Sequence, residues 1–360
     1  MPSRRFHGKT RSGCASCKAR HVKCGEERPV CKNCIRRNTS CVYPSEGSPE
    51  SNSKPERTPV AAESVNDSFD ALDLTLMHRY STVTSLCLLP SSGAQRVWQS
   101  EVPMTAREYP LLQHGMLALA AMDLACASAD EGEQGQMALY RAKGLHHQQL
   151  ALPMFRALLL RDEHREQNVI FIFSIMLVIM AFASAQSAPT QPTLDEILDM
   201  FALFLGPRAL WEIHQNGVNK DIIQTLFPKA LPDQPDLPEA EYMSPDNPMI
   251  GVEHPDIDES CAEAVRQIRW AWARHRNDHD DVRAMGWFPA LMPQGFYEQC
   301  QEHRPIALAI LDLYASILKP FHNRWWISSW HTILSSAIKN VVANEKIRLP
   351  VLVDPSRMGP

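Results

Sequence analysis

Six cysteines near the start of the chain are the clearest candidates for a chemical role, because thiols bind metals and form disulfides. They are Cys14, Cys17, Cys24, Cys31, Cys34 and Cys41. Their spacing repeats, because Cys-x2-Cys-x6-Cys occurs twice with six residues between the copies. Zinc in a structural site takes four thiolate or imidazole ligands in a closed tetrahedron. Six thiols cannot fill two separate four-sulfur sites, but they can fill two sites that share a pair of bridging thiolates.

The internal repeat predicts which thiols are shared, because each half offers its first cysteine as a bridge. We therefore expect a site for two zinc ions. The expected assignment has Cys14 and Cys31 as bridges, Cys17 and Cys24 completing one zinc, and Cys34 and Cys41 completing the other.

Two other uses of the cysteines stay open on the sequence alone. A disulfide framework needs an oxidising compartment, and residues 1–10 are basic and lack the apolar core of a signal peptide. Two independent zinc sites would need eight ligands, which would recruit His7 and His21. A domain of about 30 residues has too little core to fold unaided, so we expect metal binding to supply the folding free energy.

Basic residues gather in the same segment. Residues 1–44 hold eleven Lys and Arg against two acids, a side-chain charge of +9, whereas residues 45–360 hold 25 basic and 39 acidic residues, a net of −14. Two Zn²⁺ and six thiolates sum to about −2, so the cluster explains only a small part of this charge. The remaining asymmetry is typical of a protein that binds a polyanion.

The positions of these cations favour double-stranded DNA. A short helix after the first cysteine pair would present basic side chains on its outer side, and the second half carries a matching set. Cations hold phosphates while one or two side chains reach base edges in the major groove. The candidate DNA-binding residues are Arg11, Lys18, Arg20, His21, Lys23, Lys32, Arg36 and Arg37.

The segment from Arg11 to Pro44 resembles the fungal zinc binuclear cluster DNA-binding domain. Its run GCASCKARHVKC, residues 13–24, is similar to the branch that includes sterol uptake control proteins. The resemblance implies that the first helix enters the major groove and that Arg20, His21 and Lys23 read a short, CGG-like trinucleotide. The family often has Lys where His21 stands, so the base preference stays open. Pro29 occupies the position of a family proline that often follows a cis peptide bond.

The segment after the cluster departs from the family pattern. Family members that pair do so through a coiled coil there, whereas residues 45–70 are rich in Ser, Pro and acids and lack apolar heptads. This composition predicts a disordered linker. Monomer binding to DNA and a homodimer formed through the larger domain both stay open.

The chain from residue 71 to 360 is predicted to form a large all-α regulatory domain. Apolar residues recur there at helical spacing, Pro305 is placed as a first-turn proline, and strand-like alternation is nearly absent. The expected helices lie near 71–87, 108–127, 135–160, 163–185, 194–215, 218–227, 257–277, 305–317 and 323–344. The fold class is therefore a small zinc-stabilised cluster domain, with two short helix-loop halves, joined to an all-α domain.

The most apolar stretch, residues 169–185, has seventeen residues and no charge. A membrane helix needs about twenty residues, and Arg165 and Glu166 stand just before this run. We therefore predict a central helix buried on all sides and no membrane span.

The helical half also resembles the regulatory domain of the sterol-regulator branch. The similarity lies in residues 143–158, around His146 and His147, and in the run Trp325–Trp330. It implies a lipophilic ligand such as a sterol and control of nuclear entry. The candidate ligand-binding residues are Phe171, Met176, Trp211, Trp287, Phe288, Trp326 and Trp330. Ordinary core packing accounts for the same residues, and sequence does not separate the two.

Two further patterns bear on function. The acidic, Pro-rich segment 233–256 has no Lys or Arg and suits either a disordered activation segment or a solvated loop. The sequence contains no GxxxxGK[ST], GxGxxG, HExxH or GxSxG motif. The His146–His147 pair is more typical of surface or buried hydrogen-bonded histidines than of catalysis, so we do not expect an enzyme.

Together these patterns predict a nuclear, sequence-specific DNA-binding regulator of RNA polymerase II genes, which could shuttle from the cytoplasm and recruit transcription co-regulators. The predicted parts are a cluster domain at 1–44, a linker at 45–70 and a regulatory domain at 71–360. The alternative is a zinc-dependent protein-interaction scaffold without specific DNA binding. The basic set between Cys17 and Cys24 argues against that alternative.

Overall fold

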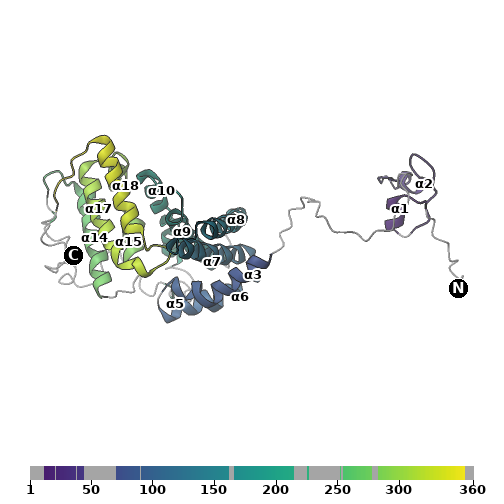
Figure 1. Cartoon of the computed structure of the whole chain (residues 1–360), viewed down its shortest axis with the longest axis horizontal. Coiled ribbons are helices and arrows are strands. Elements are labelled where there is room, and N and C mark those ends of the chain that lie inside the picture. Colours follow the sequence, from purple (N-terminus) through teal and green to yellow (C-terminus); the bar gives the residue numbers. More distant parts are fainter. Residues whose placement is uncertain are drawn as a thin grey trace. The chain divides into compact units, whose positions relative to one another are not determined.

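The computed structural model covers the whole chain. It describes residues 12–20, 22–37, 39–43, 70–89, 91–161, 166–214, 225–226, 252, 254–277 and 283–352. The chain divides into two compact units, Met1–Asp67 and Ser68–Pro360. The predicted linker falls almost wholly outside the described residues, as do the helix at 218–227 and most of the acidic segment 233–256. Each unit is described by itself (Figure 1).

The smaller unit is built on two short helices, α1 (Ala15–Ala19) and α2 (Lys32–Ile35). Each begins directly after the first cysteine of its half, so Cys14 and Cys31 are the N-cap residues. Residues three apart lie on the same face of a helix, which places both thiols of each Cys-x2-Cys pair on the inner side. The peptide bond between Arg28 and Pro29, in the loop between the halves, is cis.

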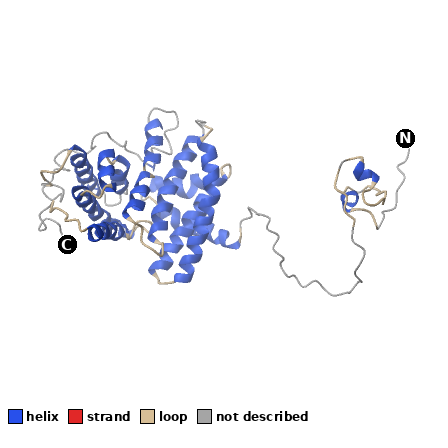
Figure 2. Ribbon diagram, turned by 90° about the horizontal axis from the view of Figure 1, so that it is seen from above, coloured by secondary structure: helices blue, strands red, loops and turns tan. Residues whose placement is uncertain are grey.

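The larger unit is helical, and no strand occurs among the residues that the structure describes (Figure 2). Its elements run in the order α3 (Ala71–Arg79), η1 (Tyr80–Thr84), α4 (Ser85–Cys87), α5 (Ser92–Arg96), η2 (Val97–Glu101), α6 (Val102–Thr105), α7 (Pro110–Asp130), α8 (Gln134–Leu159), α9 (Gln167–Gln186), α10 (Leu194–Ala202), α11 (Leu205–His214), α14 (Glu259–Asn277), α15 (Arg283–Leu291), α16 (Gln294–Gln301), α17 (Pro305–Leu318), η4 (Lys319–Asn323) and α18 (Trp330–Glu345). The segments η1 and η2 are π-helical, and η4 is a 3-10 helix.

Helix α9 lies in the middle of the larger unit and packs against α7, α8, α10 and α11. Neighbours on several sides explain why its sequence is apolar all round. By length and composition alone, α7 and α9 could each cross a membrane. The most apolar window of α7 is 83% buried in the fold and that of α9 is 72% buried, as core helices are. The predicted buried helix at 169–185 is thus present as α9.

A second group of helices, α14 to α18, follows the acidic segment. Helix α14 packs on α15, α16 and α17, and α17 packs on α18. Gln186, the last residue of α9, joins the two groups, because its side chain donates to Trp325 O (2.7 Å) and accepts from Ser329 N (2.9 Å). The Trp330 indole donates to Phe182 O (3.1 Å) in α9.

Local signals place several helix ends where the sequence predicts them. Two expected helices differ: the one at 323–344 begins only at Trp330, and the one at 194–215 is interrupted. Pro305 is the first residue of α17, and Thr193 and Glu196 form the capping box that begins α10. The single helix expected at 194–215 is instead two helices that meet at Leu203 and Phe204. The reason is Pro207, whose ring would clash with the carbonyl of Leu203 in a continuous helix.

Candidate metal centre and nucleic-acid interface

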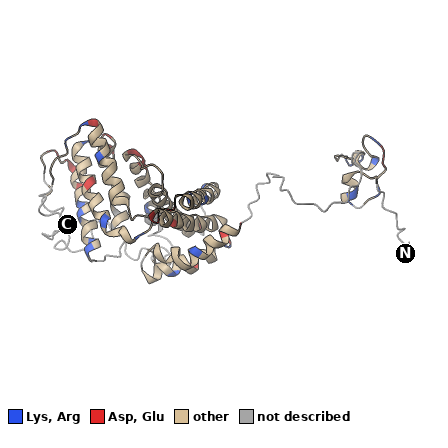
Figure 3. Cartoon of the chain, in the orientation of Figure 1, with Lys and Arg blue, Asp and Glu red and all other residues tan. Residues whose placement is uncertain are grey.

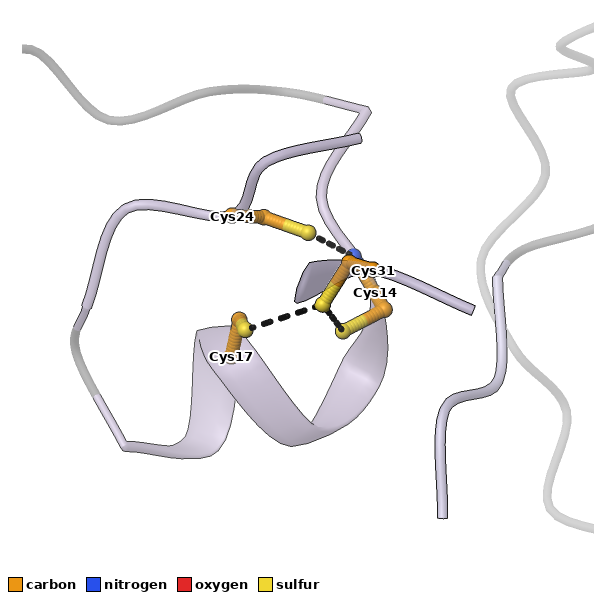
Figure 4. Close-up of side chains that lie close together, drawn as sticks. All are labelled: Cys14, Cys17, Cys24 and Cys31. Atoms are coloured by element: carbon orange, nitrogen blue, oxygen red, sulfur yellow. Dashed lines mark hydrogen bonds between the residues drawn. The ribbon is translucent and has the colours of Figure 1, made fainter. Parts of the chain in front are cut away.

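The six cysteines converge into two groups of four in the smaller unit. One group is Cys14, Cys17, Cys24 and Cys31, and the other is Cys14, Cys31, Cys34 and Cys41. The sulfurs of each group lie within 4.8 Å of one another, and Figure 4 shows the first group. Cys14 and Cys31 belong to both groups, which is the geometry that shared ligands require.

The sulfur separations fit zinc. The Cys14–Cys31, Cys17–Cys31 and Cys14–Cys34 sulfur pairs are 3.8, 3.7 and 3.8 Å apart. Four sulfurs at about 2.3 Å from a central zinc are about 3.8 Å from one another, the edge of the tetrahedron. A disulfide would need about 2.05 Å, and all six cysteines are free thiols. The donor set and its spacing therefore match tetrahedral zinc and not a disulfide framework.

Backbone hydrogen bonds support the cluster in the same way in both halves. The N–H of Cys14 donates to Cys24 Sγ (3.4 Å), and the N–H of Cys31 donates to Cys41 Sγ (3.3 Å). Burial raises the pKa of the Cys17 thiol far above its usual range, whereas Cys31, although also buried, has its pKa lowered to about 6 by hydrogen bonds led by that from the Cys34 backbone. A buried set of thiols ionises fully only when a cation offsets the charge, so metal binding here must release protons.

Most of the predicted DNA-contacting cations that the structure describes are exposed. Their positions are Lys18 on α1, Lys23 after it, Lys32 on α2, and Arg36 and Arg37 just beyond α2. Figure 3 colours the ribbon of the smaller unit blue where Lys and Arg lie. Arg11 and His21 lie outside the described residues.

The Glu27 side chain contacts the first residue of α2. Its carboxylate accepts from the N–H of Lys32 (3.1 Å) and lies 3.6 Å from Lys32 Nζ. These contacts, led by the backbone hydrogen bond, lower the pKa of Glu27. Glu27 therefore stabilises the N-terminal end of α2, while Lys23, Arg36 and Arg37 are exposed.

Arg20 differs from the other cations because its side chain is half-buried and turned toward the sulfurs. Its Nε donates to Ser16 O (3.0 Å), and its Nη2 donates to Cys34 Sγ at 3.7 Å. The contact crosses from the first half of the repeat to the second. The sequence pattern groups Arg20 with the base-reading residues and does not predict this contact.

Five of the seven predicted ligand-binding residues are described, and they are buried in the core of the larger unit at separate places. The Trp330 and Trp326 rings pack on Phe182, with ring centroids 4.2 and 6.2 Å away. Phe288 instead packs on Tyr314 and Phe296. Phe171 and Met176 are buried on α9, where Met176 closely approaches Gly115. The side chains of Trp211 and Trp287 lie outside the described residues.

The larger unit contains a buried polar cluster that the sequence pattern does not predict. His147 Nε2 lies 2.9 Å from Asp73 Oδ1, and His147 Nδ1 lies 3.1 Å from His114 Nδ1. Lys143 Nζ lies 2.8 Å from Asp73 and 2.9 Å from Asp70. His147 is thus a buried, hydrogen-bonded histidine, while its neighbour His146 is exposed. The cluster joins α3, α7 and α8.

Two family models match the chain. The fungal Zn(2)-Cys(6) binuclear cluster domain matches residues 12–48, and the fungal specific transcription factor domain matches residues 75–230. The first covers the cysteine cluster, and the second covers the helices from α3 to the region after α11.

Curated relatives agree with these matches. A Zn(2)-C6 fungal-type transcription factor, afumD, of Aspergillus fumigatus is 27% identical over 325 residues, which cover 84% of this chain and 83% of the relative. A Zn(2)-C6 fungal-type transcription factor of Gibberella zeae is 26% identical over 414 aligned residues, covering 91% and 81%. Sterol uptake control protein 2 of Candida albicans is 52% identical, but over only 40 residues, which cover 11% of this chain and 6% of the relative.

The smaller unit is therefore a cysteine-rich zinc-binding domain, and the larger unit is a helical domain of a transcription factor. The chain belongs to the Zn(2)-C6 fungal transcription factor family. Membership of this family makes the chain a transcription regulator, and it implies zinc binding, DNA binding and a nuclear location. Members of the family are generally not enzymes.

Proposed function

We propose that the six thiols hold two zinc ions, with Cys14 and Cys31 as bridges, and that the cluster so formed binds double-stranded DNA at specific sequences upstream of RNA polymerase II genes. The observation that supports this best is the pair of four-sulfur groups with two members in common. Zinc in such a site has a structural role, because all four positions around each ion are filled by protein sulfur.

The small apolar core of the cluster unit supports the same proposal. Among the residues of the cluster unit that the structure describes, the apolar side chains other than the cysteines and Tyr43 are largely exposed, including Val22, Ile35 and Val42. A unit with so little core needs the metal to hold α1 and α2 together. Loss of zinc would therefore remove the DNA-binding surface and the fold of this unit together.

The charge pattern supports DNA as the partner. Five exposed cations lie on or next to the two short helices, and each phosphate contact adds about 0.9 to the slope of log affinity against log salt. We assign Lys32, Arg36 and Arg37 to phosphate contacts and place base reading on the first half, at Lys18, His21 and Lys23. Arg11 is assigned to the phosphates beside the first half.

The larger unit is proposed to regulate this activity. In this proposal residues 45–70 act as a linker and residues 71–360 bind co-regulators, form a homodimer or control shuttling into the nucleus. The acidic segment 233–256 is proposed as an activation segment, which a reporter assay on a chain lacking it would test.

A lipophilic ligand for the larger unit is a secondary proposal. Its specific support is that the indole N–H groups of Trp325 and Trp326 are buried without a hydrogen-bond acceptor among the described residues, which would suit a ligand hydroxyl. A rise in the unfolding temperature of the larger unit with added sterol would support it. No rise at saturating sterol would reject sterols as the ligand class.

A gel-shift assay on the full chain tests the main proposal. The DNA is first selected from a random oligonucleotide pool, and affinity is then measured against salt concentration. Arg36→Ala should weaken selected and random DNA alike and reduce the salt slope by about 1. Lys339→Ala, an exposed cation of α18, is the matched control and should change neither. A zinc-loaded chain that selects no sequence would favour the interaction scaffold.

A further inference from the structure

The geometry points to Arg20 as a residue that positions and charge-balances the metal cluster, rather than one that reads a base. Its guanidinium reaches from the end of α1 to Cys34 Sγ, 3.7 Å away, a sulfur of the other half of the repeat. The inference rests on the proposed two-zinc cluster, because it takes Cys34 as a zinc ligand.

The conformation of the Arg20 side chain is held from two sides. Its Nε donates to Ser16 O, one turn back in the same helix, at 3.0 Å. This contact folds the side chain back along α1, and Nη2 then faces the cluster. Arg20 is half-buried as a result, whereas the neighbouring Lys18 and Lys23 are exposed.

The chemistry of the contact suits a zinc-bound thiolate. A hydrogen bond from a charged donor to an ionised acceptor is about twice as strong as a neutral one. Two zinc ions and six thiolates carry a net charge of about −2, and a guanidinium beside Cys34 offsets part of it. The groups that contact metal ligands orient them and tune their affinity for the metal.

The internal repeat supplies a control within the same unit. Arg20 stands three residues after Cys17, and Arg37 stands three residues after Cys34. The backbone-to-sulfur hydrogen bonds of Cys14 and Cys31 repeat in the two halves. Arg37, in contrast, is exposed. The two arginines occupy equivalent positions in the repeat but have different environments. Replacing each in turn therefore separates the effect of the Arg20–Cys34 contact from the effect of losing a positive charge.

The test compares Arg20→Gln with Arg37→Gln in the full, zinc-loaded chain. The rate of zinc transfer to a chelating dye is measured for each variant. Loss of a supporting contact to a metal ligand typically costs 10–100-fold in metal affinity. We expect Arg20→Gln to release zinc at least about tenfold faster than the parent chain and Arg37→Gln to match the parent. Arg20→Lys keeps the charge but not the planar guanidinium, so its zinc release rate should lie between those of the parent and Arg20→Gln.

Cadmium NMR adds a readout that general loss of stability would not give. With ¹¹³Cd in place of zinc, the two metals give separate resonances, and Cys34 belongs to only one of the two sulfur groups. Arg20→Gln should move mainly the resonance of that group, and Arg37→Gln should move neither. If Arg20→Gln does not hold metal, Arg20→Lys serves for this measurement.

The outcomes separate this inference from the proposed function. A parent chain that binds fewer than two metals overturns the proposed cluster and the inference with it. A parent chain with two metals, and equal release rates for Arg20→Gln and Arg37→Gln, overturns the inference alone. A changed base preference in Arg20→Gln with unchanged zinc release would show that Arg20 reads DNA, and would also overturn it.

Discussion

His147 in α8 and Asp73 in α3 form a buried hydrogen-bonded pair, with Nε2 and Oδ1 2.9 Å apart and both side chains less than 5% exposed. The carboxylate accepts, so His147 Nε2 carries a hydrogen. In the neutral ring His147 Nδ1 is then the acceptor toward His114 Nδ1, 3.1 Å away. Lys143 completes the cluster through a contact to Asp73. The first helix of the larger unit is thereby joined to the α7–α8 pair by polar contacts as well as by apolar packing.

The pair predicts a pH dependence of stability in the larger unit. Burial lowers the pKa of His147 below its usual value, which is about 6.5 in an unfolded chain. The unfolded chain therefore binds more protons than the folded one as pH falls below about 6.5, so stability should fall from pH 7.5 to pH 5.5. Asp73 acts at lower pH. Burial opposes its ionisation, but hydrogen bonds led by that from Lys143 lower its pKa, and this stabilisation is lost below about pH 4.

Tryptophan fluorescence measures this effect without interference from zinc loss, because all eight Trp lie in the larger unit. His147→Gln should remove part of the fall in unfolding temperature between pH 7.5 and pH 5.5. His78→Gln, at an exposed position on α3, should leave the fall unchanged. A His147→Gln chain with the same pH dependence as the parent would show that another group is responsible.

Asp123 in α7 predicts a large loss of stability on truncation. It accepts two hydrogen bonds from Arg79 (2.8 and 3.1 Å) and one from Thr84 Oγ1 (2.7 Å). Asp123→Ala would leave the partly buried guanidinium and the buried Thr84 hydroxyl without their acceptor, which costs about 1–3 kcal/mol. Asp130→Ala, at the exposed end of the same helix, should be nearly neutral. Urea unfolding followed by fluorescence measures both, and similar midpoints would contradict the assignment.

Two glycines of α8 predict opposite effects of the same substitution. A Cβ on Gly144 would lie 2.9 Å from Met122 Cε and 3.3 Å from Ala118 O of α7, whereas a Cβ on Gly135 meets nothing within 4 Å. Alanine gains up to about 1 kcal/mol over glycine in a helix. Gly135→Ala should therefore stabilise the larger unit, and Gly144→Ala should destabilise it by about 1 kcal/mol or more, because the α7–α8 contact must open. Thermal unfolding of the two variants decides the sign.

The cysteine assignment predicts different metal contents for bridging and terminal positions. Cys31 lies in both sulfur groups, and Cys17 lies in only one. Cys31→Ser should reduce bound zinc to well below one ion per chain, because both sites lose a ligand. Cys17→Ser should keep about one ion, at the site that retains its four sulfurs. Equal zinc contents in the two variants would show that the thiols are not shared in this way.

The parts of the fold that sequence analysis predicts are those set by local pattern. The Cys-x2-Cys repeat determines which thiols meet, because each pair lies within one helical turn. The apolar run at 169–185 has the length of a core helix, and it forms α9. These signals depend on residues close together in the chain, so no knowledge of the tertiary structure is needed.

The parts that sequence analysis misses depend on distant residues or on weak local signals. Asp73 and His147 are 74 positions apart, so nothing local pairs them. Helices α15 and α16 contain Gly286, Pro289 and Gly295, residues that normally argue against a helix, and packing on α14 overrides that preference. The contact of Arg20 with Cys34 depends on how the two halves fold together, which the basic pattern alone does not reveal.

The most direct test of the central claim is the zinc stoichiometry of the full chain, measured by native mass spectrometry on protein purified under reducing, zinc-replete conditions. The shared-sulfur geometry predicts a mass increase of two zinc ions, both lost together when the chain is denatured with a chelator. One ion per chain, or none, would contradict the account of how this chain builds its DNA-binding surface.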